Sequence, residues 1–145
     1  MSAKNITSKT LRADTAPGTG IVALAPGGIF TGYIPQTVTG DAIAVYLVAQ
    51  DEEELLQGAT QWPEARVSVE CRASSPEAAD KMGEAVIAWL RDKDRYSVVL
   101  TTGTYEASFR KEGSDEDDIS QENVQDLPVA SRRIIDFYLR YRKVA

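Results

Sequence analysis

The stretch from Ala65 to Leu90 constrains the fold most, because its hydrophobic period changes from that of a strand to that of a helix. Residues 65–72 read ARVSVECR and alternate strictly between apolar and polar side chains. That period of two is typical of a strand with one face in a core and one face in water. The apolar positions are Ala65, Val67, Val69 and Cys71.

A helix is predicted directly after this strand. Ser74-Ser75-Pro76-Glu77 combines a serine that can cap the first free amides, a proline suited to the first turn and an acid that complements the helix dipole. The following apolar residues recur at helical spacing, which predicts an amphipathic helix lying on the sheet, with Trp89 in the core. They are Ala78, Ala79, Met82, Ala85, Val86, Trp89 and Leu90.

Further strands are predicted on both sides of this unit. Ile43–Ala49 (IAVYLVA) is apolar and bounded by polar turns, and Ile29–Tyr33 is a candidate short strand. Tyr96–Leu100 and an alternating segment from Tyr105 to Phe109 flank Gly103, which predicts a hairpin.

The segment Val129–Tyr141 predicts a long closing strand. Its alternation places one set of side chains toward the core and the other toward solvent. The inward set is Ile135, Phe137, Leu139 and Tyr141, and the outward set is Asp136, Tyr138, Arg140 and Arg142.

These elements predict one α+β domain over residues 11–145, following a flexible N-terminal arm at residues 1–10. The sheet should be mainly antiparallel, with one strong amphipathic helix packed on one face and a short N-terminal helical segment. Pro17, Gly18 and Gly20 interrupt residues 11–25 and leave room for at most two short helical turns there.

Composition narrows the class of protein. With 145 residues, 43% of them hydrophobic and 26% charged, the chain can bury one core of ordinary size. No apolar run approaches the ~20 residues of a membrane helix, and MSAKNITSK lacks the apolar centre of a signal peptide. A product of the cytoplasm is expected.

The absence of histidine is the most informative negative feature of the composition. It removes Ser-His and Cys-His catalysis and every metal site that contains histidine. The single Cys71 lies on the apolar side of a strand, where a buried thiol is a better interpretation than a catalytic one. We therefore expect no enzyme, no cofactor and no metal site. A formal charge of −6 also argues against ordinary nucleic-acid binding.

Partner binding is the remaining candidate function for individual residues. Trp62 precedes a proline on a linker, and such an aromatic residue either caps the core or anchors a partner. Residues 112–123 (EGSDEDDISQEN) have the composition of a mobile acidic loop, and their spacing does not fit an EF-hand. The candidate interaction residues are Trp62, Asp115, Glu116, Asp117 and Asp118, together with Tyr138 on the outward side of the closing strand.

The order of these segments resembles the tail terminator, or tail completion, proteins of long-tailed bacteriophages and prophages. The resemblance rests on GGIFTGYIPQ, AIAVYLVA, the unit ARVSVECRASSPEAADKMGEAVIAWL, the acidic loop and the closing RRIIDFYLRYR. The chain departs from the family at Pro17, Gly18 and Gly20, where the family often has a longer helix.

The resemblance implies a structural protein of the virion neck that is assembled in the host cytoplasm. Such proteins form a ring, commonly a hexamer, which caps the head-proximal end of the tail tube, stops its polymerisation and joins tail to head. The implied partners are further copies of the chain, the major tail tube protein and a head-side connector protein, while DNA passes through the lumen without specific binding. Two alternatives stay open: a head completion or connector protein, and a small α+β ligand-binding or regulatory domain.

Overall fold

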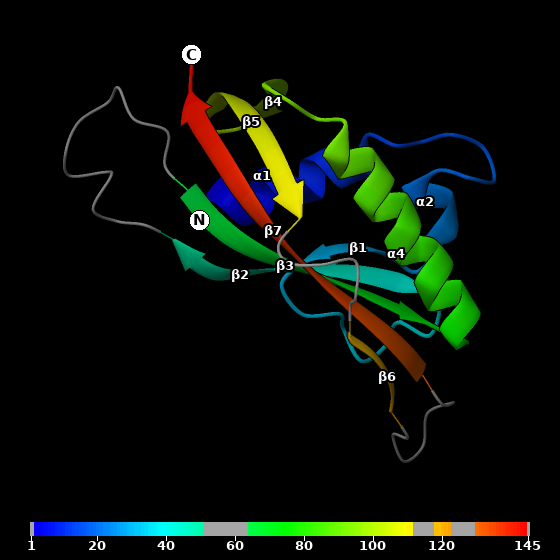
Figure 1. The fold of residues 1–145 in the computed structure, drawn as a ribbon. Helices are drawn as coiled ribbons and strands as arrows, with labels where there is room; N and C mark the ends of the chain where they lie inside the picture. The colour runs from blue at the N-terminus through cyan, green and yellow to red at the C-terminus, as the bar shows by residue number, and fades with distance from the viewer. Residues whose placement is uncertain (1, 51–63, 112–117, 123–129, 145) are drawn as a thin grey trace.

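The computed structural model describes residues 2–50, 64–111, 118–122 and 130–144 (Figure 1). In chain order its elements are α1 (Ser2–Arg12), α2 (Ile21–Leu24), β1 (Gly28–Thr31), β2 (Ala42–Gln50), β3 (Glu64–Ala73), α4 (Pro76–Arg91), β4 (Tyr96–Leu100), β5 (Gly103–Lys111), β6 (Asp118–Glu122) and β7 (Ala130–Lys143).

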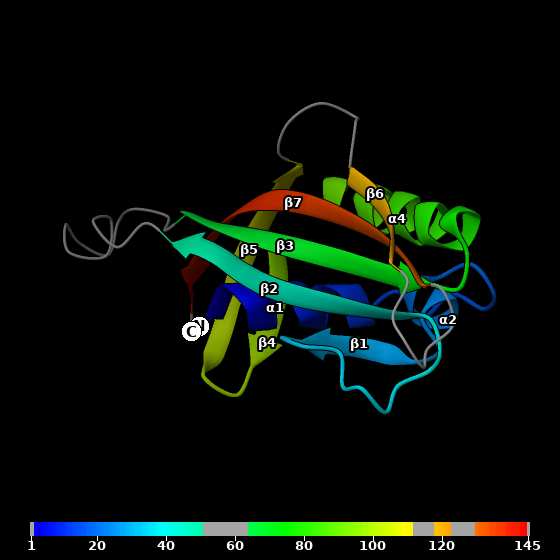
Figure 2. The ribbon, with the colours of Figure 1, turned by 90° about the horizontal axis from the view of Figure 1, so that it is seen from below.

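The strands form one curled sheet, in the order β1-β2-β3-β7-β5-β4 in the described part of the chain. β1 pairs with β2 in parallel, whereas the other pairings are antiparallel. β6 pairs with β7 beyond the end of β5, so both strands lie along one side of β7. Figure 2 shows how the curl brings β1 and β4, the two ends of the order, to either side of α1.

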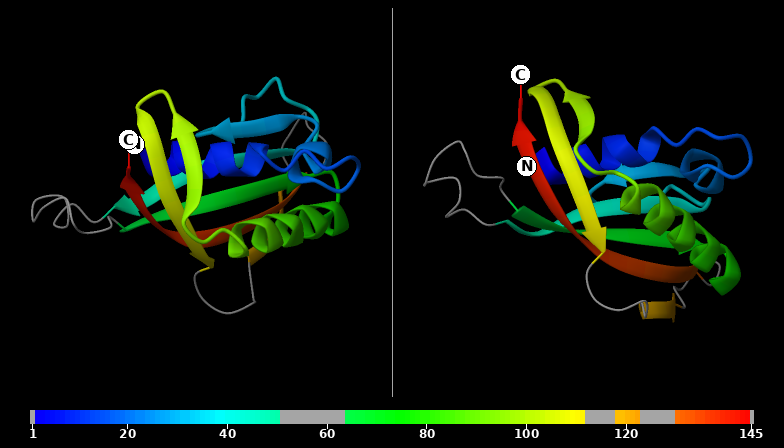
Figure 3. Two further views of the ribbon diagram at one scale, coloured as in Figure 1. Left: turned by 90° about the horizontal axis from the view of Figure 1, so that it is seen from above. Right: turned by 45° about the horizontal axis from the view of Figure 1, so that its top comes forward.

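Two helices cover the concave face of this sheet. α4 packs across β3, β7 and β5, while α1 contacts β1, β2 and β4, and both views of Figure 3 show the two helices side by side within the curl. The α+β class is therefore supported. α4 is not the one substantial helix of the described residues, however, because α1 spans 11 residues and α4 spans 16.

The predicted helix start is confirmed in detail. The Ser75 side chain accepts a hydrogen bond of 3.1 Å from the Ala78 amide, Pro76 lies at the first helical position and Glu77 lies in the first turn. These residues satisfy one free amide and place negative charge at the positive end of the helix. The chain therefore turns sharply from β3 into α4.

The expectation of a flexible arm over residues 1–10 is wrong for the residues that the structure describes. Ala3, Ile6 and Leu11 of α1 are fully buried. The segment reads as polar partly because of hydroxyl side chains whose hydrogen bonds are made within the helix and not to water. Three of them reach carbonyl oxygens four residues earlier: Thr7 to Ala3 at 2.9 Å, Ser8 to Lys4 at 2.6 Å and Thr10 to Ile6 at 2.7 Å. Since these groups are paired, burying them costs little.

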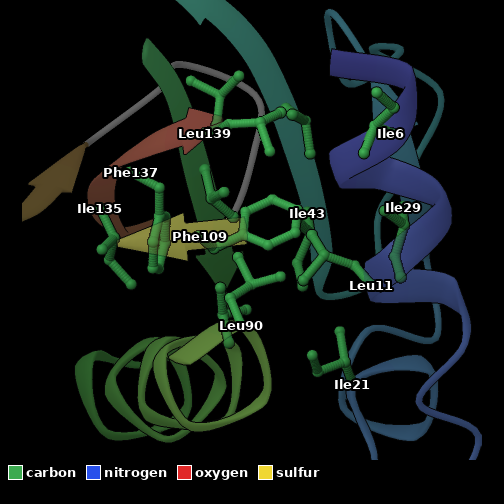
Figure 4. Packing of buried hydrophobic residues seen from close by; sticks show 14 of the residues in the cluster. Ile6, Leu11, Ile21, Ile29, Ile43, Leu90, Phe109, Ile135, Phe137 and Leu139 are labelled. Atoms are coloured by element: carbon green, nitrogen blue, oxygen red, sulfur yellow. The ribbon is translucent and has the colours of Figure 1, made fainter. Parts of the chain in front are cut away.

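The hydrophobic core lies between the sheet and the two helices (Figure 4). Residues Ile135, Phe137, Leu139 and Tyr141 of β7 point into it, as their alternation predicts. Ile6 and Leu11 of α1, Ile43 of β2 and Leu90 of α4 are among its fully buried aliphatic residues. Cys71 is also fully buried and lies within this cluster, as expected.

Trp89 lies at the junction of α1 and α4 and is only partly buried. Its indole Nε1 donates a 2.7 Å hydrogen bond to the Thr10 carbonyl oxygen, and the Lys93 ammonium lies 3.5 Å from the ring centroid. Trp89 therefore packs against the core and ties the two helices together, but it is not the fully buried residue that the sequence predicts.

Candidate interaction surface

The convex face of the sheet carries the outward-facing polar side chains of three neighbouring strands, β3, β7 and β5. Register places Arg66 of β3 and Arg110 of β5 on either side of Tyr138 of β7. Residues directly opposite each other in antiparallel strands project to the same face. The outward-facing side chains that the sequence predicts for β7 therefore lie beside the outward-facing side chains of β3 and β5.

Tyr138 lies at the centre of this face. The Arg110 guanidinium carbon lies 4.9 Å from the Tyr138 ring centroid, within range of a cation–π interaction. The two side chains line a hollow of about 190 Å³, together with Glu64, Ser108 and Arg140. Tyr138 is partly exposed and Arg110 is exposed. The hollow thus presents an aromatic ring and two arginines beside the Glu64 carboxylate, a surface that an aromatic or charged side chain of a partner can cover.

Ion pairs surround the hollow. Arg66 donates to Asp136 at 2.9 Å, and Arg140 lies 3.8 Å from Glu64. Both pairs are substantially exposed, so each contributes little to folding stability. They hold the arginine side chains over the sheet and leave a surface of mixed charge.

A second cluster of the convex face centres on Glu70, which is 8% exposed. The Tyr46 hydroxyl donates to one Glu70 carboxylate oxygen at 2.8 Å, and Arg132 donates to the other at 2.9 Å. Burial, followed by the hydrogen bond to the Glu70 carboxylate and its charge, raises the pKa of Tyr46 to about 12. Tyr33, which is 87% exposed, contacts the Tyr46 ring edge-on at a centroid distance of 6.2 Å.

An arginine of the concave face is a feature that sequence reasoning missed. Arg133 is 3% exposed, and its Nη1 lies 2.9 Å from the Asp80 carboxylate and 3.2 Å from the Glu84 carboxylate of α4. A Cβ on Gly83 would lie 2.6 Å from Arg133 Cδ, so the glycine makes room for the arginine. Two features of the sequence indicate this contact: a glycine inside a helix, and an arginine at a position of β7 whose side chain faces the core.

The structure places few of the other predicted interaction residues. Trp62, Asp115, Glu116 and Asp117 lie outside the described residues. Asp118 is the first residue of β6 and stands opposite Ile134 of β7. The expected loop over residues 112–123 is thus wrong for residues 118–122, where β6 forms against β7. β6 obtains backbone hydrogen bonds by pairing with the long β7, and this pairing lets a polar segment form a strand.

The described residues contain neither a candidate metal site nor a candidate membrane-spanning helix. Within residues 2–50, 64–111, 118–122 and 130–144, no group of three or more acidic, cysteine or histidine side chains is arranged to hold a metal ion. None of the helices in these ranges has the length and hydropathy of a membrane span.

Comparison with solved structures finds a similar fold. No protein-family model matches the chain, and no curated protein matches it. Among solved structures, the fold is similar to that of a chain in the virion of a native gene transfer agent particle, with a TM-score of 0.58 and 16% sequence identity. The match covers 96% of this chain and 93% of the other. At this identity the similarity shows the fold.

Proposed function

We propose that the chain is a structural protein of a phage-like virion, and that its role there is that of a tail terminator. One observation carries this proposal: the fold matches a chain of a gene transfer agent virion over almost the whole length of both chains. The resemblance of the sequence to tail terminator proteins supports the same role independently, since it rests on segments of the sequence and not on coordinates.

In the proposed role, copies of the chain form a ring, with six as the expected number, on the head-proximal end of the tail tube. The ring stops the growth of the tube and presents a surface to a head-side connector protein. The major tail tube protein and the connector are the proposed partners, and the protein works by binding, without catalysis. The convex face around Tyr138 is a suitable contact surface, because it presents an aromatic ring and arginines that a neighbour can cover.

The formal charge of −6 per chain fits a ring through which DNA passes. A wall of net negative charge repels phosphates and does not hold the duplex, whereas a basic wall would bind it through counterion release. The proposed location is the neck of the virion, after assembly in the host cytoplasm, as the resemblance to tail terminator proteins implies.

Electron microscopy of lysates made without this protein tests the proposal. Loss of a terminator leaves filled heads and separate tails, and some tails are over-long because nothing stops tube polymerisation. Tails of normal length beside leaking, empty heads would instead indicate a head completion or connector protein. Intact infectious virions would exclude a role in the neck.

Light scattering of the purified protein, alone and with tail tubes, tests the ring. We expect assembly of the protein on the tubes, whether or not the free protein is already a ring. A monomer in both conditions at high protein concentration would contradict the proposal.

A further inference from the structure

The two ends of the curled sheet are protected differently. At the β1 end, side chains of α1 cover the strand: Ser8 and Thr31 share a hydroxyl hydrogen bond of 2.7 Å, and Arg12 donates to the Ile29 carbonyl oxygen at 2.6 Å. At the other end β4 pairs with β5 alone among the described residues. α1 contacts β4 as well, but no described strand pairs with the outer edge of β4, so this edge has backbone donors and acceptors for an incoming segment.

A groove runs beside this open edge. It has a volume of about 400 Å³ and is lined by Lys9, Arg12 and Ala13 of α1 and by residues 96–99 of β4. Val99 is 62% exposed, and Lys9 is exposed as well. The groove thus combines a free strand edge, an apolar wall and two cationic side chains, which is the combination that binds an extended acidic and apolar peptide.

One segment of the chain has the complementary chemistry. Residues 51–57 read DEEELLQ, so four consecutive carboxylates precede two leucines. Residues 112–117 (EGSDED) are acidic but have no apolar side chain, and residues 123–129 (NVQDLPV) have a single acid. Residues 51–57 are therefore the best match to a groove that presents both positive charge and an apolar wall.

We propose that the groove beside β4 binds residues 51–57 of a neighbouring copy of the chain. The edge of β4 would bind the backbone of the segment, the apolar wall its leucines, and Lys9 and Arg12 its carboxylates. This inference rests on the proposed function, because a ring is built from contacts between two different surfaces of each copy. The segment after β2 and the groove at β4 are such a pair.

A labelled peptide of residues 50–58, titrated with the full chain and followed by fluorescence anisotropy, tests the contact. We expect saturable binding that weakens as salt rises, because the carboxylates and cations are solvent-accessible. Val99→Asp and Lys9→Glu should each weaken binding by roughly tenfold or more, since each adds a negative charge where an acidic peptide binds. Val22→Asp and Lys81→Glu are the matched controls, because they make the same changes at exposed positions away from the groove. They should bind as the unaltered chain does.

A peptide with serine in place of both leucines should lose most of its affinity. Equal binding of both peptides, equal effects of the groove and control variants, or no saturable binding would each overturn the inference. A further variant replaces residues 51–58 of the protein by glycine and serine. If the peptide binds to this variant but not to the unaltered chain, the chain's own segment fills the groove. That result would also overturn a contact between copies.

The peptide test and the electron microscopy test can fail separately. Peptide binding by a protein whose absence leaves virions infectious would retain the contact and remove the terminator role. A protein that caps tubes but does not bind the peptide would retain the role and remove this contact.

Discussion

At the scale of single residues, Gly83 and Arg133 make the most specific contact between α4 and the sheet. A methyl group at residue 83 would overlap the Arg133 side chain, whose guanidinium is held by Asp80 and Glu84. Gly83→Ala should therefore lower the free energy of unfolding by about 1–3 kcal/mol through overpacking. The better helix propensity of alanine, worth about 1 kcal/mol, offsets part of this loss. Urea denaturation measures the net change.

The same substitution in an Arg133→Ala background is the control. With the arginine side chain removed, the three atoms nearest to the methyl group are gone, and the gain in helix propensity should dominate. Gly83→Ala should then stabilise the protein by roughly 1 kcal/mol. If Gly83→Ala changes the free energy of unfolding in the same direction in both backgrounds, Gly83 is not required to accommodate Arg133.

Tyr46 gives a prediction at alkaline pH. Its folded-state pKa of about 12 lies above the ordinary value of 10.0, so the folded protein keeps the phenol proton over a range in which the unfolded chain has lost it. The contribution to stability is fully present below pH 10 and is lost as the pH rises toward 12. Ultraviolet titration of the protein, minus that of Tyr46→Phe, isolates this phenol.

Glu70→Gln tests the cause of the shift. It removes the carboxylate charge beside the hydroxyl and leaves the size of the side chain nearly unchanged. The pKa of Tyr46 should fall but stay above 10, because burial is the larger cause. An unchanged titration curve would show that Glu70 has no part in the shift.

At the scale of elements, α1 is the helix whose role needs a direct test. Ile6→Ala should cost roughly 2–5 kcal/mol of unfolding free energy, because Ile6 is fully buried. Asn5→Ala on the exposed side of the same helix should change stability little. Thermal melting of both variants distinguishes a core helix from a loose arm, for which the two substitutions would be equally mild.

The elements show where sequence patterns are sufficient and where they fail. β3, β7 and α4 follow from the sequence because each has a clear hydrophobic period, and α4 also has the cap at Ser75. α1 was missed because buried serine and threonine hydroxyls resemble a solvated segment until their carbonyl partners are known. The parallel pairing of β1 with β2 depends on contacts between distant segments, and no local pattern encodes it.

The core-facing side of α4 was predicted only approximately. Gly83 and Ile87 are buried, whereas the predicted Ala78 and Trp89 are partly exposed, so the buried stripe is rotated around the helix. Arg133 explains the burial of the glycine, because its side chain lies across α4 at that turn. Tyr138 could be placed on the outer face from alternation alone, but its contact with Arg110 required the strand order.

At the scale of the whole molecule, the curl of the sheet separates the two surfaces to which the proposals assign partners. The hollow around Tyr138 lies on the convex face, over β5 and β7, and the groove beside β4 lies at the open end of the strand order. In the proposed assembly the groove would bind residues 51–57 of a neighbouring copy, and the hollow would stay available to the tail tube, so one copy can contact both partners at once.

The last prediction concerns the convex face as an interface. Tyr138→Ala and Arg110→Glu should leave the melting temperature nearly unchanged, because both side chains are at least partly exposed and neither is part of the buried cluster. Under the proposed function, both should reduce assembly on tail tubes, since they remove the aromatic ring or reverse the charge of the hollow.

Arg91→Glu is the matched control for this prediction, because it reverses the charge of an exposed arginine on α4, which covers the opposite face of the sheet. Light scattering of each variant with tail tubes gives the comparison. If Arg91→Glu impairs assembly and the Tyr138 and Arg110 variants do not, the concave side is the interface. Loss of assembly in the Tyr138 and Arg110 variants alone, with melting unchanged, assigns the contact to the convex face, because only a surface role separates binding from folding in this way.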